Sequence, residues 1–343
     1  ELGFATYEAL FAEATGIDVA AAVAEAEATL KATEDAYRDL LAYTLRKLAI
    51  RVDLRPRGEG AVHDLARAGR LEPLDDVFPD RRLRSTVEGL LADIGLSPDA
   101  GGRIDVDFEP RAAKTASGAF APNVPHEVLL VRGPESGAGG FRAFFRALAR
   151  AQAFAGANPD AFFEERRLID PALPGCWGVL FEHLLQDPRF LKRALDVDPR
   201  DGLEAARMLA VMELAELRRE CAQLAFERTL YAEGPRAELA GLYRERMQKA
   251  MLLEWPVERW LFDVEPRFAT LRRLRGRALE ALVSRRVLEE ADEDYWRNPR
   301  FGALLRSWFS KSCALDADAF AKSLGGALDL HAAAQRIIRV AAA

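Results

Sequence analysis

The sequence predicts a mainly α-helical protein with one small β-sheet, and three observations support this. Segments rich in Ala, Leu, Glu and Arg repeat apolar residues every three or four positions, which is the period of an amphipathic helix. One stretch, residues 104–131, changes to the alternating and β-branched pattern of strands. Breaks that contain Pro or Gly divide the remainder into segments of ordinary helix length.

The elements can be justified in order along the chain. The stretch from Tyr7 to Ala49 has helical periodicity, and Thr33-Glu34-Asp35 predicts a helix start, because polar and acidic residues favour the first turn. Ile104 to Phe108 alternates between apolar and acidic residues. After a turn rich in Gly, Ala and Pro, Val128 to Val131 is apolar, so we expect a small antiparallel sheet.

The segment after the sheet predicts a helix with two different faces. The linker Arg132–Gly137 and the pair Gly139-Gly140 break regular structure, and a helix is expected from Phe141 to Ala155. Its apolar residues share one face, whereas arginines recur every four residues on the opposite face, at Arg142, Arg146 and Arg150. From there to the end the chain is expected to be helical, with breaks at Asn158-Pro159, Asp170 to Gly175, Asp198-Pro199, Gly234-Pro235, Trp255-Pro256 and Asn298-Pro299.

The composition excludes several classes of function. A net charge of -6 and a pI near 5.5 argue against nucleic acid as a main partner, although the run Arg272–Arg277 is locally basic. No apolar run reaches the roughly 18 residues of a membrane span, and Glu1 to Thr15 lacks the layout of a signal peptide. We therefore expect a cytoplasmic protein without a membrane partner. The three cysteines are widely spaced, without a CxxC pair, so neither a disulfide framework nor a thiolate zinc site is indicated.

The order of segments around the arginine-bearing helix resembles the catalytic core of the thimet oligopeptidase and oligoendopeptidase F family of zinc metallopeptidases. Ala119-Phe120-Ala121-Pro122 is similar to a turn of the G-A-F-C-x-P type, Glu127–Val131 to the strand after it, and Phe141–Ala151 to the helix that carries H-E-x-x-H. Downstream, Cys176–Leu184 keeps the spacing of the segment around the third zinc ligand. The resemblance extends from about Tyr7 to Leu324, and it implies a helical metallopeptidase-like domain with a small antiparallel sheet beside the former H-E-x-x-H helix.

The resemblance also implies that the zinc site is lost. The two histidine positions hold Arg146 and Arg150, the general-base position holds Ala147, and the third-ligand position holds Gly175. A guanidinium stays protonated and offers only donors, and alanine cannot take a proton from water. The family's transition-state tyrosine is matched by Arg273. We therefore expect no catalytic residues, no metal and no cofactor, and an enzyme that is inactive as a zinc peptidase.

Other sites receive little support from the sequence. The four histidines, His63, His126, His183 and His331, include no pair at the i, i+4 spacing of a helical metal site. There is no G-x-S-x-G motif and no phosphate-binding glycine loop. We expect His183 to be a packed or capping residue and His126 to be exposed.

Two further predictions concern side chains around the former site. Glu182 follows Gly175 by seven residues, about two helical turns, so it should point the same way. We expect Arg146 and Arg150 to be neutralised by Asp170 and Glu182, or by a bound anion. The family also holds extended substrates along a sheet edge, which needs no zinc. The candidate peptide-binding edge strand is Glu127, Val128, Leu129, Leu130 and Val131.

The leading hypothesis is a pseudopeptidase with an N-terminal lobe, residues 1–155, and a C-terminal lobe, residues 156–343, integrated around a central cleft. It would be retained for binding a peptide, a protein partner or an active paralogue. Two alternatives stay open. The arginine-rich cleft could serve an enzyme or binding protein for anionic ligands, because arginine suits carboxylate and phosphate recognition. The chain could also be a structural subunit of a complex.

Overall fold

The computed structural model describes residues 3–48 and 60–343, and it confirms a mainly α-helical protein with one small sheet. The chain forms two compact units. Unit 1 combines Glu1–Gly69, Ala210–Leu274 and Leu330–Ala342, and unit 2 combines Arg70–Leu209 with Arg275–Asp329. These units differ from the predicted lobes 1–155 and 156–343, because each is assembled from segments far apart in the sequence. One integrated domain with a central cleft stays a prediction.

Unit 1 is helical within the part of the chain that the structure describes. The predicted helix start at Thr33-Glu34-Asp35 is confirmed, since α3 begins at Glu34. The predicted end of this helical stretch at Ala49 lies outside the described residues. The α-helices that contribute to unit 1 are α1 (Tyr7–Thr15), α2 (Val19–Ala32), α3 (Glu34–Lys47), α4 (Val62–Gly69), α10 (Pro199–Glu233), α11 (Leu239–Met251), α12 (Ala269–Ala291) and α15 (Leu330–Ala342), with the unit boundaries falling inside α10 and α12.

A buried arginine joins three helices of unit 1. Arg218 of α10 is 1% exposed, and its guanidinium lies 4.8 Å from the ring centre of Tyr37. Its Nε donates to the carbonyl of Ala250 at 2.9 Å, and its Nη1 donates to the carbonyl of Leu30 at 2.7 Å and to the hydroxyl of Thr33. The hydroxyl of Thr33 therefore serves this arginine instead of capping α3.

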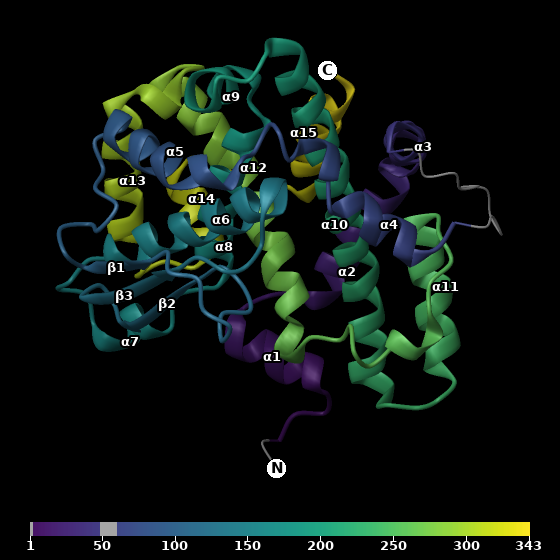
Figure 1. Cartoon of the computed structure of the whole chain (residues 1–343). Coiled ribbons are helices and arrows are strands. Elements are labelled where there is room, and N and C mark those ends of the chain that lie inside the picture. The colour runs from purple at the N-terminus through teal and green to yellow at the C-terminus, as the bar shows by residue number, and fades with distance from the viewer. Residues whose placement is uncertain (1–2, 49–59) are drawn as a thin grey trace. The chain divides into compact units, whose positions relative to one another are not determined.

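Unit 2 contains the sheet and the helix that carries the arginines. Its strands are β1 (Ile104–Asp107), β2 (Gly118–Asn123) and β3 (Glu127–Val131). Its complete α-helices are α5 (Asp80–Asp93), α6 (Gly137–Ala155), α7 (Phe163–Arg167), α8 (Ala172–Glu182), α9 (Pro188–Leu195), α13 (Pro299–Ser312) and α14 (Ala317–Ser323). The helix α6 packs along β2 and β3 and is in turn covered by α8 (Figure 1).

The strand order corrects the predicted sheet. The order is β1-β3-β2, with β3 antiparallel to β2 but parallel to β1, so the sheet is mixed. The predicted edge strand is therefore the central one. Leu129, Leu130 and Val131 pair with neighbours on both sides, whereas Val128 pairs with β1 and Glu127 with β2. The two edges along which a peptide strand would add are therefore occupied by β1 and β2. The hydrophobic pattern marked these residues as a strand but carried no information about which neighbours they would pair with.

The start of α6 also differs from the prediction. The helix begins at Gly137, four residues before Phe141, so the glycines belong to its first turn. At Gly140 a Cβ would lie 2.6 Å from the carbonyl oxygen of Glu135, which leaves no room for a side chain. The glycines therefore permit a close backbone approach instead of breaking the helix.

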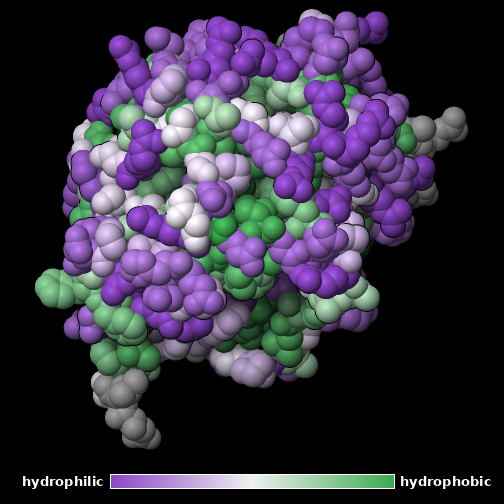
Figure 2. Space-filling view, turned by 60° about the vertical axis from the view of Figure 1, so that its left-hand side comes forward, coloured by the Kyte–Doolittle hydropathy of each residue, from purple (hydrophilic) through white to green (hydrophobic). Residues whose placement is uncertain are grey.

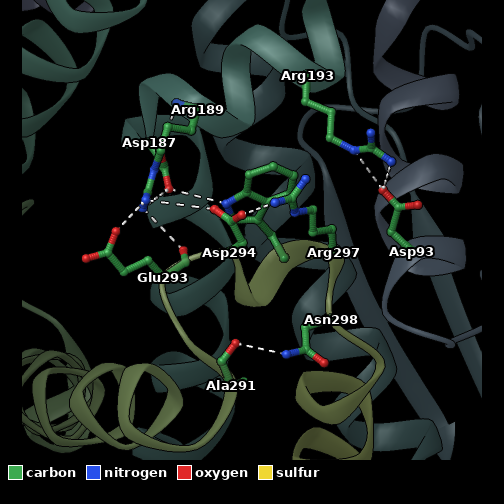
Figure 3. A network of polar contacts seen from close by, with 10 residues as sticks. Asp93, Asp187, Arg189, Arg193, Ala291, Glu293, Asp294, Arg297 and Asn298 are labelled. Carbon is green, nitrogen blue, oxygen red and sulfur yellow. Dashed lines mark hydrogen bonds and ion pairs between the residues drawn. The ribbon is translucent and has the colours of Figure 1, made fainter.

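A surface network of charges ties α9 to its neighbours within unit 2 (Figure 3). Arg189 Nη1 lies 2.7 Å from Glu293 of the loop after α12, and Arg189 also pairs with Asp187, which caps α9. Arg193 pairs with Asp93 of α5 at 3.0 Å. Because most of these groups are largely exposed, each pair contributes little to stability.

The surface carries scattered apolar areas. Figure 2 shows a mostly hydrophilic face interrupted by green apolar patches. In unit 2 the most exposed large apolar side chains belong to β2, α7 and the residues beside α7, at Phe120, Phe162, Phe163 and Leu168. No helix among residues 3–48 and 60–343 has the length and apolar character needed to cross a bilayer.

Candidate functional site

The helix α6 is fixed on its inner side by large aromatic residues. Phe141, Phe144 and Phe145 are completely buried, and Leu148 is buried beside them. Ala147, which stands at the expected general-base position, is only 2% exposed, so it belongs to this packed side. The rigid inner side determines where the arginines of the other face can reach.

The helices α6 and α8 approach each other closely at a glycine. A Cβ at Gly178 would lie 3.4 Å from the carbonyl oxygen of Arg146 and 3.4 Å from Nε of Arg150. A larger residue at this position would push against the helix that carries both arginines. One turn earlier on α8, a Cβ at Gly175 would meet nothing within 4 Å, so the expected third-ligand position opens onto free space.

Two arginines of α6 share one buried carboxylate of α8. The side chain of Glu182 is 1% exposed, and its Oε1 accepts a hydrogen bond of 2.6 Å from Nε of Arg142. Its Oε2 accepts from Nε of Arg146. The side chains of Arg142 and Arg146 are 13% and 28% exposed, so the cluster is largely withdrawn from solvent. We call Arg142, Arg146 and Glu182 the arginine clamp.

The observed partners of the arginines agree only in part with those predicted from the sequence. Glu182 does lie against Arg146, as its position two turns after Gly175 predicted. The prediction did not include Arg142, whose spacing of four residues before Arg146 places it on the same face. Arg150 is an exposed residue on the same helix, beside Gly178.

Asp170 has a different role from the one predicted. Its Oδ1 accepts from the backbone N–H of Ala172 and its Oδ2 from that of Ala317, both at 3.0 Å. These residues are the first of α8 and α14. The carboxylate therefore caps two helix starts, and among the described residues its hydrogen bonds go to these backbone groups instead of to Arg146 or Arg150.

A second buried polar pair lies behind α8 and has no local sequence signal. His183 Nδ1 lies 2.8 Å from Oε1 of Glu280 on α12, and Ser284 donates to the same oxygen. Both the imidazole ring and the carboxylate are buried, as expected for a packed histidine. Burial, reinforced by the negative charge of Glu280, raises the pKa of the Cys176 thiol well above its ordinary value, so this cysteine stays a neutral core residue. The separation of 97 residues between His183 and Glu280 explains why the pair could not be predicted.

The resemblance to zinc metallopeptidases makes zinc the metal to test against these residues. A zinc ligand must offer a lone pair from imidazole, thiolate or carboxylate. At the expected positions Arg146 and Arg150 offer only donors, and Gly175 has no side chain. Glu182 is already held by two guanidinium groups. Within the described ranges, 3–48 and 60–343, no three His, Cys, Asp or Glu side chains are grouped so that they could hold a metal ion. The residues present do not fit zinc.

Comparison with solved structures identifies the type of fold. A carboxypeptidase of Pyrococcus furiosus, in a form described as apo-Mg, matches over 96% of this chain and 68% of its own, with 14% identity and a TM-score of 0.61. Metallocarboxypeptidase 1 of Trypanosoma cruzi matches with 97% and 69% coverage, 14% identity and a TM-score of 0.61. An M32 carboxypeptidase of Deinococcus radiodurans R1 matches with 97% and 82% coverage, 13% identity and a TM-score of 0.55.

The chain has a metallocarboxypeptidase-like fold. At these identities the similarity concerns the fold alone. No protein-family model matches the sequence, and no curated protein shows significant similarity to it. The expected helical metallopeptidase-like architecture is thus supported by these solved structures. A specific relation to thimet oligopeptidase and oligoendopeptidase F stays a prediction.

Proposed function

We propose that this protein is a catalytically inactive metallopeptidase homologue, retained to bind a peptide or protein partner. The observation that carries the proposal is the arginine clamp. On the helix that corresponds to the expected zinc-binding helix, Arg142 and Arg146 hold the buried Glu182, so this position is occupied by a charge-neutralised polar cluster.

The chemistry of the clamp supports inactivity as a zinc peptidase. A peptidase of this kind needs a Lewis acid and a base that takes a proton from water. The guanidinium groups of Arg146 and Arg150 would repel a divalent cation, and Ala147 cannot act as a base. No other described side chain replaces these groups as part of a metal-ligand cluster.

Metal content and peptide cleavage test whether the protein is inactive as a zinc peptidase. Protein equilibrated with zinc and then desalted is expected to carry far less than one zinc per chain, measured by elemental analysis. It is expected to release no C-terminal residue from blocked dipeptides and no fragment from longer peptides. Stoichiometric zinc together with peptide cleavage would disprove the proposal.

Two variants make the test specific. Gly175→Glu has room for the new side chain, but it is expected to leave both zinc binding and activity absent, because both arginines remain. Combining Gly175→Glu with Arg146→His, Ala147→Glu and Arg150→His supplies two imidazoles, a base and a carboxylate. Only this combination is expected to gain zinc. If Gly175→Glu alone became active, the assignment of these positions would be wrong.

The binding part of the proposal requires an outer strand, since β3 is central. The strand β2 pairs with β3 on one side, and its Phe120 is 57% exposed. An extended peptide with an apolar side chain opposite Phe120 could add to β2 through backbone hydrogen bonds. This mode needs neither a metal nor a catalytic residue.

Random hexapeptides retained on the immobilised protein and identified by mass spectrometry provide the probe. The affinity of the best peptide is expected to fall at least tenfold when alternate peptide nitrogens are methylated, and to fall in Phe120→Ala. Leu288→Ala removes another exposed apolar side chain of unit 2 and is expected to bind as the unaltered protein does. Equal binding by Phe120→Ala would contradict strand addition at β2, and retention of no peptide would favour a purely structural subunit.

A further inference from the structure

A small cavity of unit 2, away from the clamp, collects three cationic side chains. It has a volume of about 260 Å³ and lies between the loop after β1 and the end of β3. Arg111 and Lys114 line it from the loop, and Arg132 lines it from the strand end. The remaining lining consists of Ala, Gly and Pro residues, so the charged groups provide its chemical character.

The three cations differ in how deeply they are held. The side chain of Lys114 is 9% exposed, that of Arg132 is 21% exposed, and that of Arg111 is 60% exposed. The ammonium of Lys114 lies 2.8 Å from a carboxylate oxygen of Asp107 and donates to the backbone carbonyls of Asp107 and Glu109. Burial, and then the nearby charges of Arg111 and Arg132, lower the pKa of Lys114.

The carboxylates close to the cavity do not use all the donors of these cations. Asp107 is shared by Lys114 and Arg111. Arg132 lies 3.3 Å from Asp80, whose side chain is 43% exposed. A guanidinium carries five N–H donors in a planar fork, more than one carboxylate can accept, so both arginines keep donors for a second oxyanion.

The walls of the cavity are fixed by hydrogen bonds between its two segments. The hydroxyl of Ser117 accepts from the backbone N–H of Gly133 at 2.9 Å and donates to Glu135 at 3.1 Å. The backbone N–H of Ser117 donates to the same carboxylate at 3.0 Å. A Cβ at Gly133 would collide with the backbone of Ala116 and Ser117, so the segments touch directly. A cavity held in this way needs little rearrangement when a ligand enters.

We propose that this cavity binds a small oxyanion, a phosphate group or a compact carboxylate, between Arg111 and Arg132 beside Lys114. A phosphate presents three oxygens to donors that come from several directions, and arginine forks match it bidentately. The ligand would use the arginine donors that Asp80 and Asp107 leave unused, since the carboxylate of Glu135 is held by Ser117. The volume limits the ligand to a free anion or the charged end of a small molecule.

The test uses the full chain and titrates inorganic phosphate, O-phosphoserine and citrate separately at constant ionic strength, with heat and 31P line width as readouts. We expect saturable binding of at least one of the three at one site. Tighter binding of O-phosphoserine than of inorganic phosphate would indicate a phosphorylated small molecule, and preference for citrate would indicate a carboxylate.

The matched variants separate this site from general charge effects. Arg111→Gln combined with Arg132→Gln is expected to weaken binding at least tenfold, whereas Arg300→Gln, which removes an exposed arginine elsewhere in unit 2, should not. Ala112→Glu adds a carboxylate to the lining without removing any contact and is also expected to abolish binding. Saturable binding that persists in both test variants, or no saturable binding of any of the three anions to the unaltered protein, would overturn the proposal. Neither result bears on the peptidase-like site.

Discussion

The arginine clamp predicts that Glu182→Ala destabilises the protein strongly. The carboxylate is 1% exposed and accepts from two guanidinium groups that are 13% and 28% exposed. Its removal leaves Arg142 and Arg146 withdrawn from solvent without this counter-charge. Breaking a buried ion pair by removing one partner costs about 3–5 kcal/mol in the free energy of unfolding. We expect a loss in that range for Glu182→Ala.

The matched control is Glu293→Ala, which also removes a carboxylate paired with an arginine in unit 2. Glu293 lies 2.7 Å from Arg189, but its side chain is 80% exposed (Figure 3). Solvent screens this pair, so its loss should cost at most about 1 kcal/mol. Urea unfolding followed by circular dichroism measures both variants under the same conditions.

A third variant separates the charge effect from packing. Replacing Arg142 and Arg146 by Met and Glu182 by Leu removes all three charges at similar volume, and such replacements are often close to neutral. We expect the triple variant to be more stable than Glu182→Ala. The reasoning would be refuted if Glu182→Ala and Glu293→Ala lost the same stability, because burial would then have no effect.

Three further predictions rest on other buried groups. Burial raises the pKa of the Glu227 carboxyl above its ordinary value of 4.5, so ionisation of this group opposes folding. Urea unfolding at several pH values should show that Glu227→Gln matches the unaltered protein in acid. As the pH rises through the folded pKa, the variant should become the more stable of the two. Arg218→Ala should cost about 3 kcal/mol by the same assay, because three buried acceptors lose their donor. Gly276→Ala should lower the free energy of unfolding by about 1–3 kcal/mol, because the new Cβ would lie 2.9 Å from the carbonyl oxygen of Ala172. Gly241→Ala is the control: its Cβ would meet open space, so this variant should be neutral or more stable by up to about 1 kcal/mol.

Periodicity predicted two of the three strands of unit 2 but neither the third strand nor the pairing, because β2 lies where a turn rich in Gly, Ala and Pro was expected. The alternation at Ile104–Asp107 and the apolar run at Glu127–Val131 identified strands correctly, because side-chain alternation is a local property. Which strand lies in the middle depends on how the two connections between the strands pass the chain from one position in the sheet to another, and no local pattern records that. The parallel pairing of β1 with β3 therefore could not be read from the sequence, and the predicted edge strand was wrong for this reason.

The outcome for the two predicted acids shows where spacing arguments hold. Glu182 lies on a helix at a fixed distance in sequence from Gly175, so the helical period determines its direction, and it does meet Arg146. Asp170 lies before the first turn of α8, where free backbone N–H groups compete for a carboxylate. The N–H of Ala172, two residues away, takes one carboxylate oxygen, and the N–H of Ala317 at the start of α14 takes the other.

The clamp gives the proposed loss of a zinc site a physical basis. In a zinc site of the expected kind, the metal ion supplies the positive charge, and a carboxylate from a later helix binds the ion and completes the site. Here the positive charge is built into α6 by Arg142 and Arg146, and Glu182 of α8 supplies the negative partner. The same two helices remain joined through a buried ionic contact, so the body can stay packed without the metal. A carboxylate added at Gly175 has room, but it supplies only one ligand, so the proposal expects zinc to bind only once Arg146 and Arg150 have also been replaced by ligands.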